Sequence, residues 1–242
     1  MWALCYTCFT YRMQDFIHTP LHQHPAPHRE LYRRYRAYSS RSGFRKSVFL
    51  GVLLLISAWI VNFIAIYIAT QHASSAVTDI ILSNIPVFDV DGYFVYGTFI
   101  IGGLGALVLL AHPKQVPFAL HALALFIIIR SGFIVMTHLG PPEVLYSSDF
   151  GVTITRAFFG ADQFFSAHTG MPFLAALAFW HVPKLRYAFL AATVYFATVV
   201  LMGHIHYTID VMSAFFITYG IFHIAQWLFP REWEIFLAEE QS

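Results

Sequence analysis

Long apolar stretches recur along the chain, and they constrain its fold more than any other feature. A helix needs about 20 predominantly apolar residues to cross the hydrocarbon core of a bilayer. Six stretches meet or approach this length: 47–69, 94–111, 117–138, 169–181, 185–204 and 207–229. The fourth is short and contains Pro172. Counting it predicts an all-α, polytopic membrane protein with six transmembrane helices and both ends of the chain on one side.

The composition supports a membrane protein and excludes several other classes. The chain is 58% hydrophobic and 11% charged, whereas a soluble domain carries about 25% charged residues. Such a high apolar content excludes intrinsic disorder, and two cysteines in 242 residues exclude a disulfide-stapled scaffold. No basic run interleaved with aromatic residues is present in a soluble context, so we expect no nucleic-acid partner.

Loop charges predict the orientation of these helices. The loop 70–93 contains acids and no Lys or Arg, and acids outnumber bases in the loop 139–168. The intervening short loops carry Lys114, Lys184 and Arg186. Since Lys and Arg are enriched in cytoplasmic loops, this alternation predicts that both termini are cytoplasmic.

The charge distribution also suggests three parts: a cytoplasmic basic and His-rich tail (1–46), a six-helix transmembrane catalytic domain (47–229) and a cytoplasmic C-terminal tail (230–242). The first part holds eight of the 14 Lys and Arg residues and lacks the pattern of a signal peptide. Its Cys5 and Cys8 form a single CxxC without a second pair, which is not typical of a zinc site.

Polar residues near the predicted outer face are candidates for chemistry. Ionisable groups inside a membrane are costly and are usually functional. Arg130 lies within the third stretch, where it either snorkels toward the lipid headgroups or offers its planar guanidinium to a phosphate. His206 and Asp210 are four residues apart, so on a helix they share one face, and the carboxylate can orient the imidazole. His168 begins another predicted span at the same membrane depth.

Simpler interpretations of these histidines remain open. A single interfacial His is often a polar helix cap, and the His204/His206 pair resembles two metal ligands. However, the repeated histidine boxes of membrane di-iron oxygenases are missing from the sequence. We therefore predict no metal and no other cofactor.

At these stretches the chain resembles the sphingomyelin synthase family, a branch of the type 2 phosphatidic acid phosphatase superfamily. The family pattern G-D-x-x-x-S-G-H-T is approached by residues 161–169, in which Asp162, Ser166 and His168 match and alanine replaces both glycines. The pattern H-Y-T-x-D is matched without change by residues 206–210. The resemblance extends over about residues 84–230, in order and with the same predicted topology.

Two motifs of the wider superfamily are missing. No K-x6-R-P occurs in the chain, and Val199 and Val200 stand where an S-R pair would precede the second histidine. Sphingomyelin synthases also lack these motifs, so their absence favours that branch over ordinary lipid phosphatases.

The resemblance implies a phospho-head-group transferase that works through a phospho-histidine. His206, oriented by Asp210, would be the nucleophile and His168 the general acid and base. Arg130, Asp162, Ser166 and Tyr207 would contact the phosphate or the substrate. The implied partners are a phospholipid donor and a lipid-alcohol acceptor such as ceramide, at an active site on the extracytoplasmic face.

Two other function classes remain open from the sequence. One is a lipid phosphatase or phospholipase C-type hydrolase in which water is the acceptor. The other is a transporter or scaffold, although the two halves of the chain show no internal repeat. The head group and the oligomeric state are not indicated by the sequence.

Overall fold

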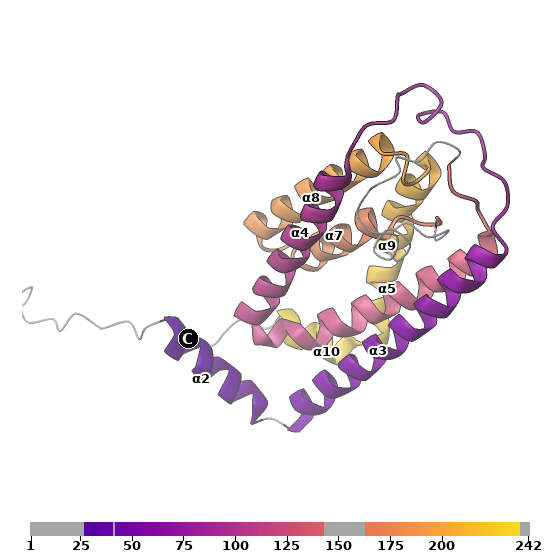
Figure 1. Ribbon diagram of the computed structural model, residues 1–242. Coiled ribbons are helices and arrows are strands. Elements are labelled where there is room, and N and C mark those ends of the chain that lie inside the picture. The colour runs from indigo at the N-terminus through magenta and orange to yellow at the C-terminus, as the bar shows by residue number, and fades with distance from the viewer. Residues whose placement is uncertain (1–26, 41, 143–162, 238–242) are drawn as a thin grey trace, which may run out of the picture. The chain divides into compact units, whose positions relative to one another are not determined.

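A computed structural model describes residues 27–40, 42–142 and 163–237, and within these residues all regular structure is helical. The chain divides into two units, Met1–Ala37 and Tyr38–Ser242. Most of α2 (Pro27–Ser39), an amphipathic helix rich in arginine, lies in the first unit (Figure 1).

The second unit contains the helices that surround the candidate site (Figure 1). In chain order they are α3 (Ser42–Gln71), α4 (Asp91–Ala111), the 3-10 helix η1 (Pro113–Gln115), α5 (Val116–Thr137), α7 (Ala167–Ala178), α8 (Pro183–Met202), α9 (Thr208–Leu228) and α10 (Pro230–Leu237).

Five segments of the described chain are long and apolar enough to cross a membrane, as expected of an integral membrane protein. They are Ser42–Gln71, Asp91–Ala111, Pro113–Thr137, Pro183–Met202 and Thr208–Leu228. Many of their large apolar side chains are exposed, including Phe63 and Phe99, and a bilayer would cover them.

The helix at the fourth predicted span is shorter than a full crossing. α7 has 12 residues, or about 18 Å of helix, against a hydrocarbon core of about 30 Å. It ends at Ala178, and a short turn leads into Pro183, the first residue of α8. The all-helical class is therefore confirmed, whereas the count of six spans is not.

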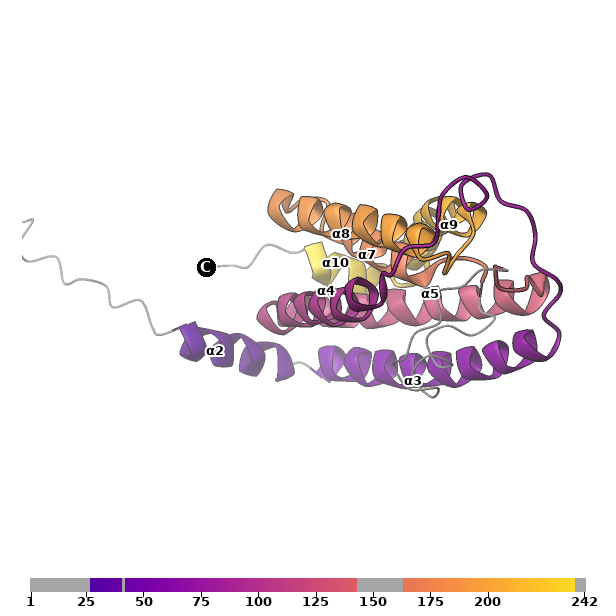
Figure 2. The ribbon, with the colours of Figure 1, turned by 45° about the horizontal axis from the view of Figure 1, so that its top comes forward.

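Several helices of the second unit pack side by side. α3 runs beside α5 along much of its length, as both views show (Figures 1 and 2), and α7 packs against α8 and α9. Between α3 and α5 the hydroxyl of the buried Ser131 donates to Oδ1 of Asn62 at 3.3 Å. At the far end of the unit the Ser47 hydroxyl donates to the Glu232 carboxylate at 2.7 Å, which ties α10 to the start of α3.

α7 packs deeply against its neighbours because Gly170 has no side chain. A Cβ atom at this position would lie 2.8 Å from the Phe126 ring on α5 and 2.8 Å from the Thr218 hydroxyl on α9. This close approach sets the depth at which α7, and with it His168, lies against α5 and α9.

We predict that Gly170→Ala destabilises the protein by about 1–3 kcal/mol, because overpacking forces the neighbours to shift. Gly132→Ala on α5 is the matched control, since its Cβ would meet no atom within 4 Å and alanine favours the helix. The melting temperature in detergent measures both effects. Equal melting temperatures for the two variants would contradict the close packing of α7.

Candidate active site

Segments from distant parts of the chain meet at the end of the second unit where α3 and α5 finish and α7 and α9 begin, here called the site end. The Ser74 amide donates to the His138 carbonyl at 2.9 Å, which joins the ends of α3 and α5. The Phe88 amide donates to the Met202 carbonyl at 3.0 Å, which joins the loop before α4 to the end of α8. The site end is therefore held together by backbone hydrogen bonds between loops.

Asp210 contacts His206 from the first turn of α9. Asp210 Oδ2 lies 3.4 Å from Nδ1 of His206 and accepts the Tyr207 amide at 2.9 Å. The expectation of a shared helical face was wrong in its geometry, because α9 begins at Thr208 and His206 precedes it. The carboxylate instead reaches back over the start of its own helix, as a residue at the third helical position commonly does.

The second carboxylate oxygen of Asp210 also lies inside the protein. Asp210 is fully buried, and its Oδ1 has no hydrogen-bond partner among the described residues. His206 is 4% exposed, so the pair is shielded from solvent. An ionised carboxylate favours a proton on the ring nitrogen that faces it, and it thereby fixes the tautomer of the imidazole. With Nδ1 facing Asp210, Nε2 is the His206 atom left for chemistry.

A backbone hydrogen bond joins the two histidine segments. The Ser166 amide donates to the Asp210 carbonyl at 3.1 Å, across 44 positions of sequence. Two residues later, His168 lies in the first turn of α7. His168 is within electrostatic range of both His206 and Arg130. The structure thus brings together the three charged or titratable groups that the sequence placed on three different helices.

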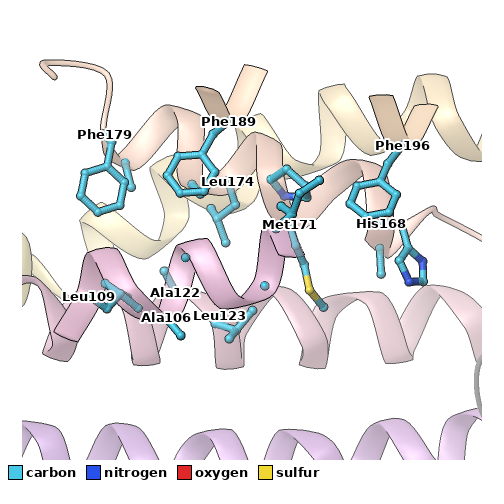
Figure 3. A pocket seen from close by; sticks show the side chains of 18 of the residues that line it. Ala106, Leu109, Ala122, Leu123, His168, Met171, Leu174, Phe179, Phe189 and Phe196 are labelled. Carbon is cyan, nitrogen blue, oxygen red and sulfur yellow. The ribbon is translucent and has the colours of Figure 1, made fainter. Parts of the chain in front are cut away.

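The ring of His168 packs against two phenylalanines. Its centroid lies 4.4 Å from that of Phe94 on α4 and 5.6 Å from that of Phe196 on α8. Figure 3 shows His168 and Phe196 together at one end of an apolar cavity. These two aromatic neighbours, which also contact each other at 6.4 Å between centroids, limit the orientations that the imidazole can adopt.

The Ser166 hydroxyl caps α7. It accepts hydrogen bonds from the Thr169 amide at 3.4 Å and the Thr169 hydroxyl at 3.3 Å, and Ser166 is fully buried. Serine is among the preferred residues at this position because its oxygen satisfies an amide that the helix leaves unpaired. In the described structure, the predicted substrate-contacting hydroxyl supports the helix that carries His168.

Arg130 lies inside the helix bundle. Its side chain is 4% exposed, and its Nε donates to the Phe165 carbonyl at 2.7 Å, just before Ser166. This burial excludes the alternative in which Arg130 snorkels to the headgroups. The guanidinium instead holds the segment that leads into α7 and places a cation near His168.

The Tyr207 hydroxyl joins the loop after α5 to the loop after α3. It is buried, donates to the Gly140 carbonyl at 3.0 Å and accepts the Val77 amide at 3.2 Å. An added Cβ at Gly140 would collide with the Ser74 carbonyl, so these loops pass very close to each other. Asp162, the remaining predicted substrate residue, lies outside the described residues.

Asp79 is a site residue that the sequence analysis missed. Its carboxylate accepts the Thr208 hydroxyl at 2.6 Å and the Thr208 amide at 2.7 Å, and it also accepts the amides of Ile81 and Leu82. It therefore caps α9 from the loop between α3 and α4, and it does so at Thr208, two residues after His206. Nothing in the sequence distinguished Asp79 from the other acids of that loop.

The site end contains charges of both signs. α7 begins there with the partial positive charge of a helix N-terminus, whereas the N-terminus of α9 is already capped by the carboxylates of Asp79 and Asp210. Arg130 adds a full positive charge close by. Within the described ranges, no group of three or more His, Cys, Asp and Glu side chains is placed to hold a metal ion.

Comparison with known proteins identifies the same region. Residues 160–227 match the family described as PAP2 superfamily C-terminal, a stretch that includes both histidine segments. The match supports the type 2 phosphatidic acid phosphatase superfamily. It does not separate the sphingomyelin synthase-like branch from the rest. No curated protein and no solved structure matches the chain.

We predict that Asp79 stabilises the fold more at neutral than at acidic pH. Its partial burial favours the neutral form, but the hydrogen bonds from Thr208, Leu82 and Ile81 outweigh this effect and lower the pKa of Asp79 below its usual 3.8. This stabilisation is therefore fully present above the unfolded-state pKa and is lost as the pH falls through the lower folded-state pKa.

Asp79→Asn is expected to reduce the melting temperature at pH 7 and to flatten its decline on acidification. Asp89→Asn is a suitable control from the same loop, because Asp89 accepts one amide, from Asp91 at 3.3 Å. Identical pH dependence of melting in wild type and Asp79→Asn would exclude this role of Asp79.

Proposed function

We propose that the protein transfers a phospho-head group from a glycerophospholipid to ceramide or a similar lipid alcohol. The superfamily match suggests lipid phosphatase or phosphotransferase activity in general. The observation that carries the proposal is the Ser166–Asp210 backbone bond, since it sets the His168 segment beside the His206–Asp210 pair. A nucleophile from the segment just before α9 and an acid from α7 would thereby meet at one site.

In the first step, Nε2 of His206 attacks the phosphorus of the donor. The phosphorus–oxygen bond to glycerol breaks, and protonated His168 gives its proton to the departing diacylglycerol oxygen. Asp210 stabilises the positive charge that develops on the His206 ring. The products are diacylglycerol and a phospho-head group bonded to His206.

In the second step, now neutral His168 removes the proton from the acceptor hydroxyl. The acceptor oxygen attacks the phosphorus, and the phosphorus–nitrogen bond to His206 breaks. Both histidines return to their starting protonation states. A lipid alcohol as acceptor gives head-group transfer, and water gives hydrolysis, which the superfamily match equally favours.

The four predicted substrate residues divide into two roles in this proposal. Arg130 remains the candidate for balancing phosphate charge, because it is a buried cation within electrostatic range of His168. Ser166 and Tyr207 position the backbone around the histidines through the hydrogen bonds described above. Asp162 remains a candidate substrate contact on sequence grounds.

His206→Ala is expected to abolish turnover of labelled phospholipid. Asp210→Asn is expected to reduce it strongly. The first removes the nucleophile, and the second removes the charge that stabilises its cationic form. His223→Ala is the control, because His223 is an exposed histidine further along α9 that pairs with Gln226. Head-group transfer is measured in detergent or vesicles, with melting temperatures to verify folding.

The same assay separates the candidate functions. Labelled head group on ceramide indicates a transferase, and a released phospho-head group indicates a hydrolase. Full activity in His206→Ala would overturn the nucleophile assignment, and a wild-type protein that forms neither product would overturn the enzyme proposal.

We also propose that the site end faces the extracytoplasmic side, on the basis of the loop charges. In a chain whose Cys5 and Cys8 are replaced by serine, Asp89→Cys should react with a membrane-impermeant maleimide on intact cells. Lys184→Cys, at the start of α8, should react after the cells are opened. The opposite pattern would place the site on the cytoplasmic side.

A further inference from the structure

An apolar cavity of about 380 Å³ lies against His168, between α4, α5, α7 and α8. Thr98 and His168 supply its polar side chains, at one end, and the remaining lining is aliphatic, aromatic or glycine. Such a lining offers no partner for a charged or strongly polar ligand, whose desolvation would be costly. It suits a hydrocarbon.

The cavity is elongated along α7. Figure 3 shows His168 and Phe196 at one end, Met171 and Leu174 along the middle, and Phe179 at the other end. His168 and Phe179 are 11 positions apart, which corresponds to about 16 Å along a helix. One leaflet is half of a hydrocarbon core of about 30 Å, so the cavity matches the depth of a single leaflet.

The volume of the cavity corresponds to one hydrocarbon chain. An apolar protein cavity of about 150 Å³ binds benzene, which has six carbons. On that scale 380 Å³ accommodates about 15 carbons. One long acyl chain would fill this space, and two would not fit.

We propose that this cavity binds one acyl chain of the glycerolipid donor. The ester end of the chain lies at His168 and its methyl end lies toward Phe179 and Phe189. This inference rests on the proposed function, in which His168 protonates the glycerol oxygen that leaves. An acyl chain attached to that glycerol therefore starts beside His168, where the cavity begins.

Small residues on α4 keep the cavity wide. Gly102, Gly105 and Ala106 line it, and a Cβ atom added at Gly102 or Gly105 would meet no atom within 4 Å. Gly102 and Ala106 remain exposed. The α4 side of the cavity therefore offers a lateral route by which an acyl chain could enter from the bilayer. The size of these residues determines how far a chain can extend.

Replacing Gly102 or Gly105 with leucine should shorten the donor acyl chain that the enzyme prefers. Gly102 lies three positions nearer to the His168 end than Gly105, or about 4.5 Å along the helix. We expect Gly105→Leu to shift the preference from palmitoyl toward lauroyl donors, and Gly102→Leu to shift it further toward octanoyl donors. Gly103→Leu is the matched control, since Gly103 does not line the cavity and has equally open surroundings.

The measurement is kcat/KM for diacylglycerol release from donors that share one head group and differ in acyl length. Burial of each methylene changes binding by up to about fourfold, so the shifts are large enough to resolve. Equal chain-length profiles for Gly105→Leu and Gly103→Leu would overturn the proposal. So would a shift that follows the acyl length of the acceptor and not that of the donor.

A binding measurement separates this inference from the proposed function. A donor analogue with a diazirine near the methyl end of one acyl chain is crosslinked to the His206→Ala protein, which needs no turnover. Labelling of the α7 segment around Leu174–Phe179, lost in a protein that also carries Gly105→Leu, supports the cavity even if no enzymatic activity is found. Activity on this analogue in the wild-type chain without such labelling would overturn the cavity assignment and leave the reaction intact.

Discussion

The hydrogen bonds of Asp210 hold the candidate site together. Its carboxylate faces His206 and caps α9 through the Tyr207 amide, while its main-chain carbonyl accepts the Ser166 amide. One residue thus orients the proposed nucleophile and fixes the segment that carries the proposed acid. Burial of a carboxylate is costly without such partners, so the surrounding backbone must adopt the arrangement that supplies them.

Around this centre, loops from elsewhere in the chain are tied to the start of α9. Asp79 binds Thr208, and the Tyr207 hydroxyl joins the loops at Val77 and Gly140. In the proposed mechanism these bonds would limit the access of water, since a phospho-histidine can pass its group to a lipid alcohol or to water. Under that proposal, the balance between transfer and hydrolysis would depend on how these loops and the acceptor share the site.

Polar and apolar parts of the site lie next to each other at His168. Toward the site end are Arg130, His206 and the N-terminus of α7, which suit a phosphate, and in the other direction the cavity suits a hydrocarbon chain. A phospholipid has this same division at its glycerol backbone. The position of His168 at the boundary explains why an imidazole packs against two phenylalanine rings.

The sequence alone indicates that this is a helical membrane protein and where its candidate chemistry lies. Apolar stretches and loop charges act locally, so they indicate membrane helices without knowledge of the fold, and the segments around His168 and His206 identify the candidate chemistry. Other features required the tertiary structure. The short α7, the position of His206 before its helix, the cap from Asp79 and the cavity all depend on contacts between distant segments. Asp79 and Thr208 are 129 positions apart, and no local pattern records which loop acid reaches a helix that far along the chain.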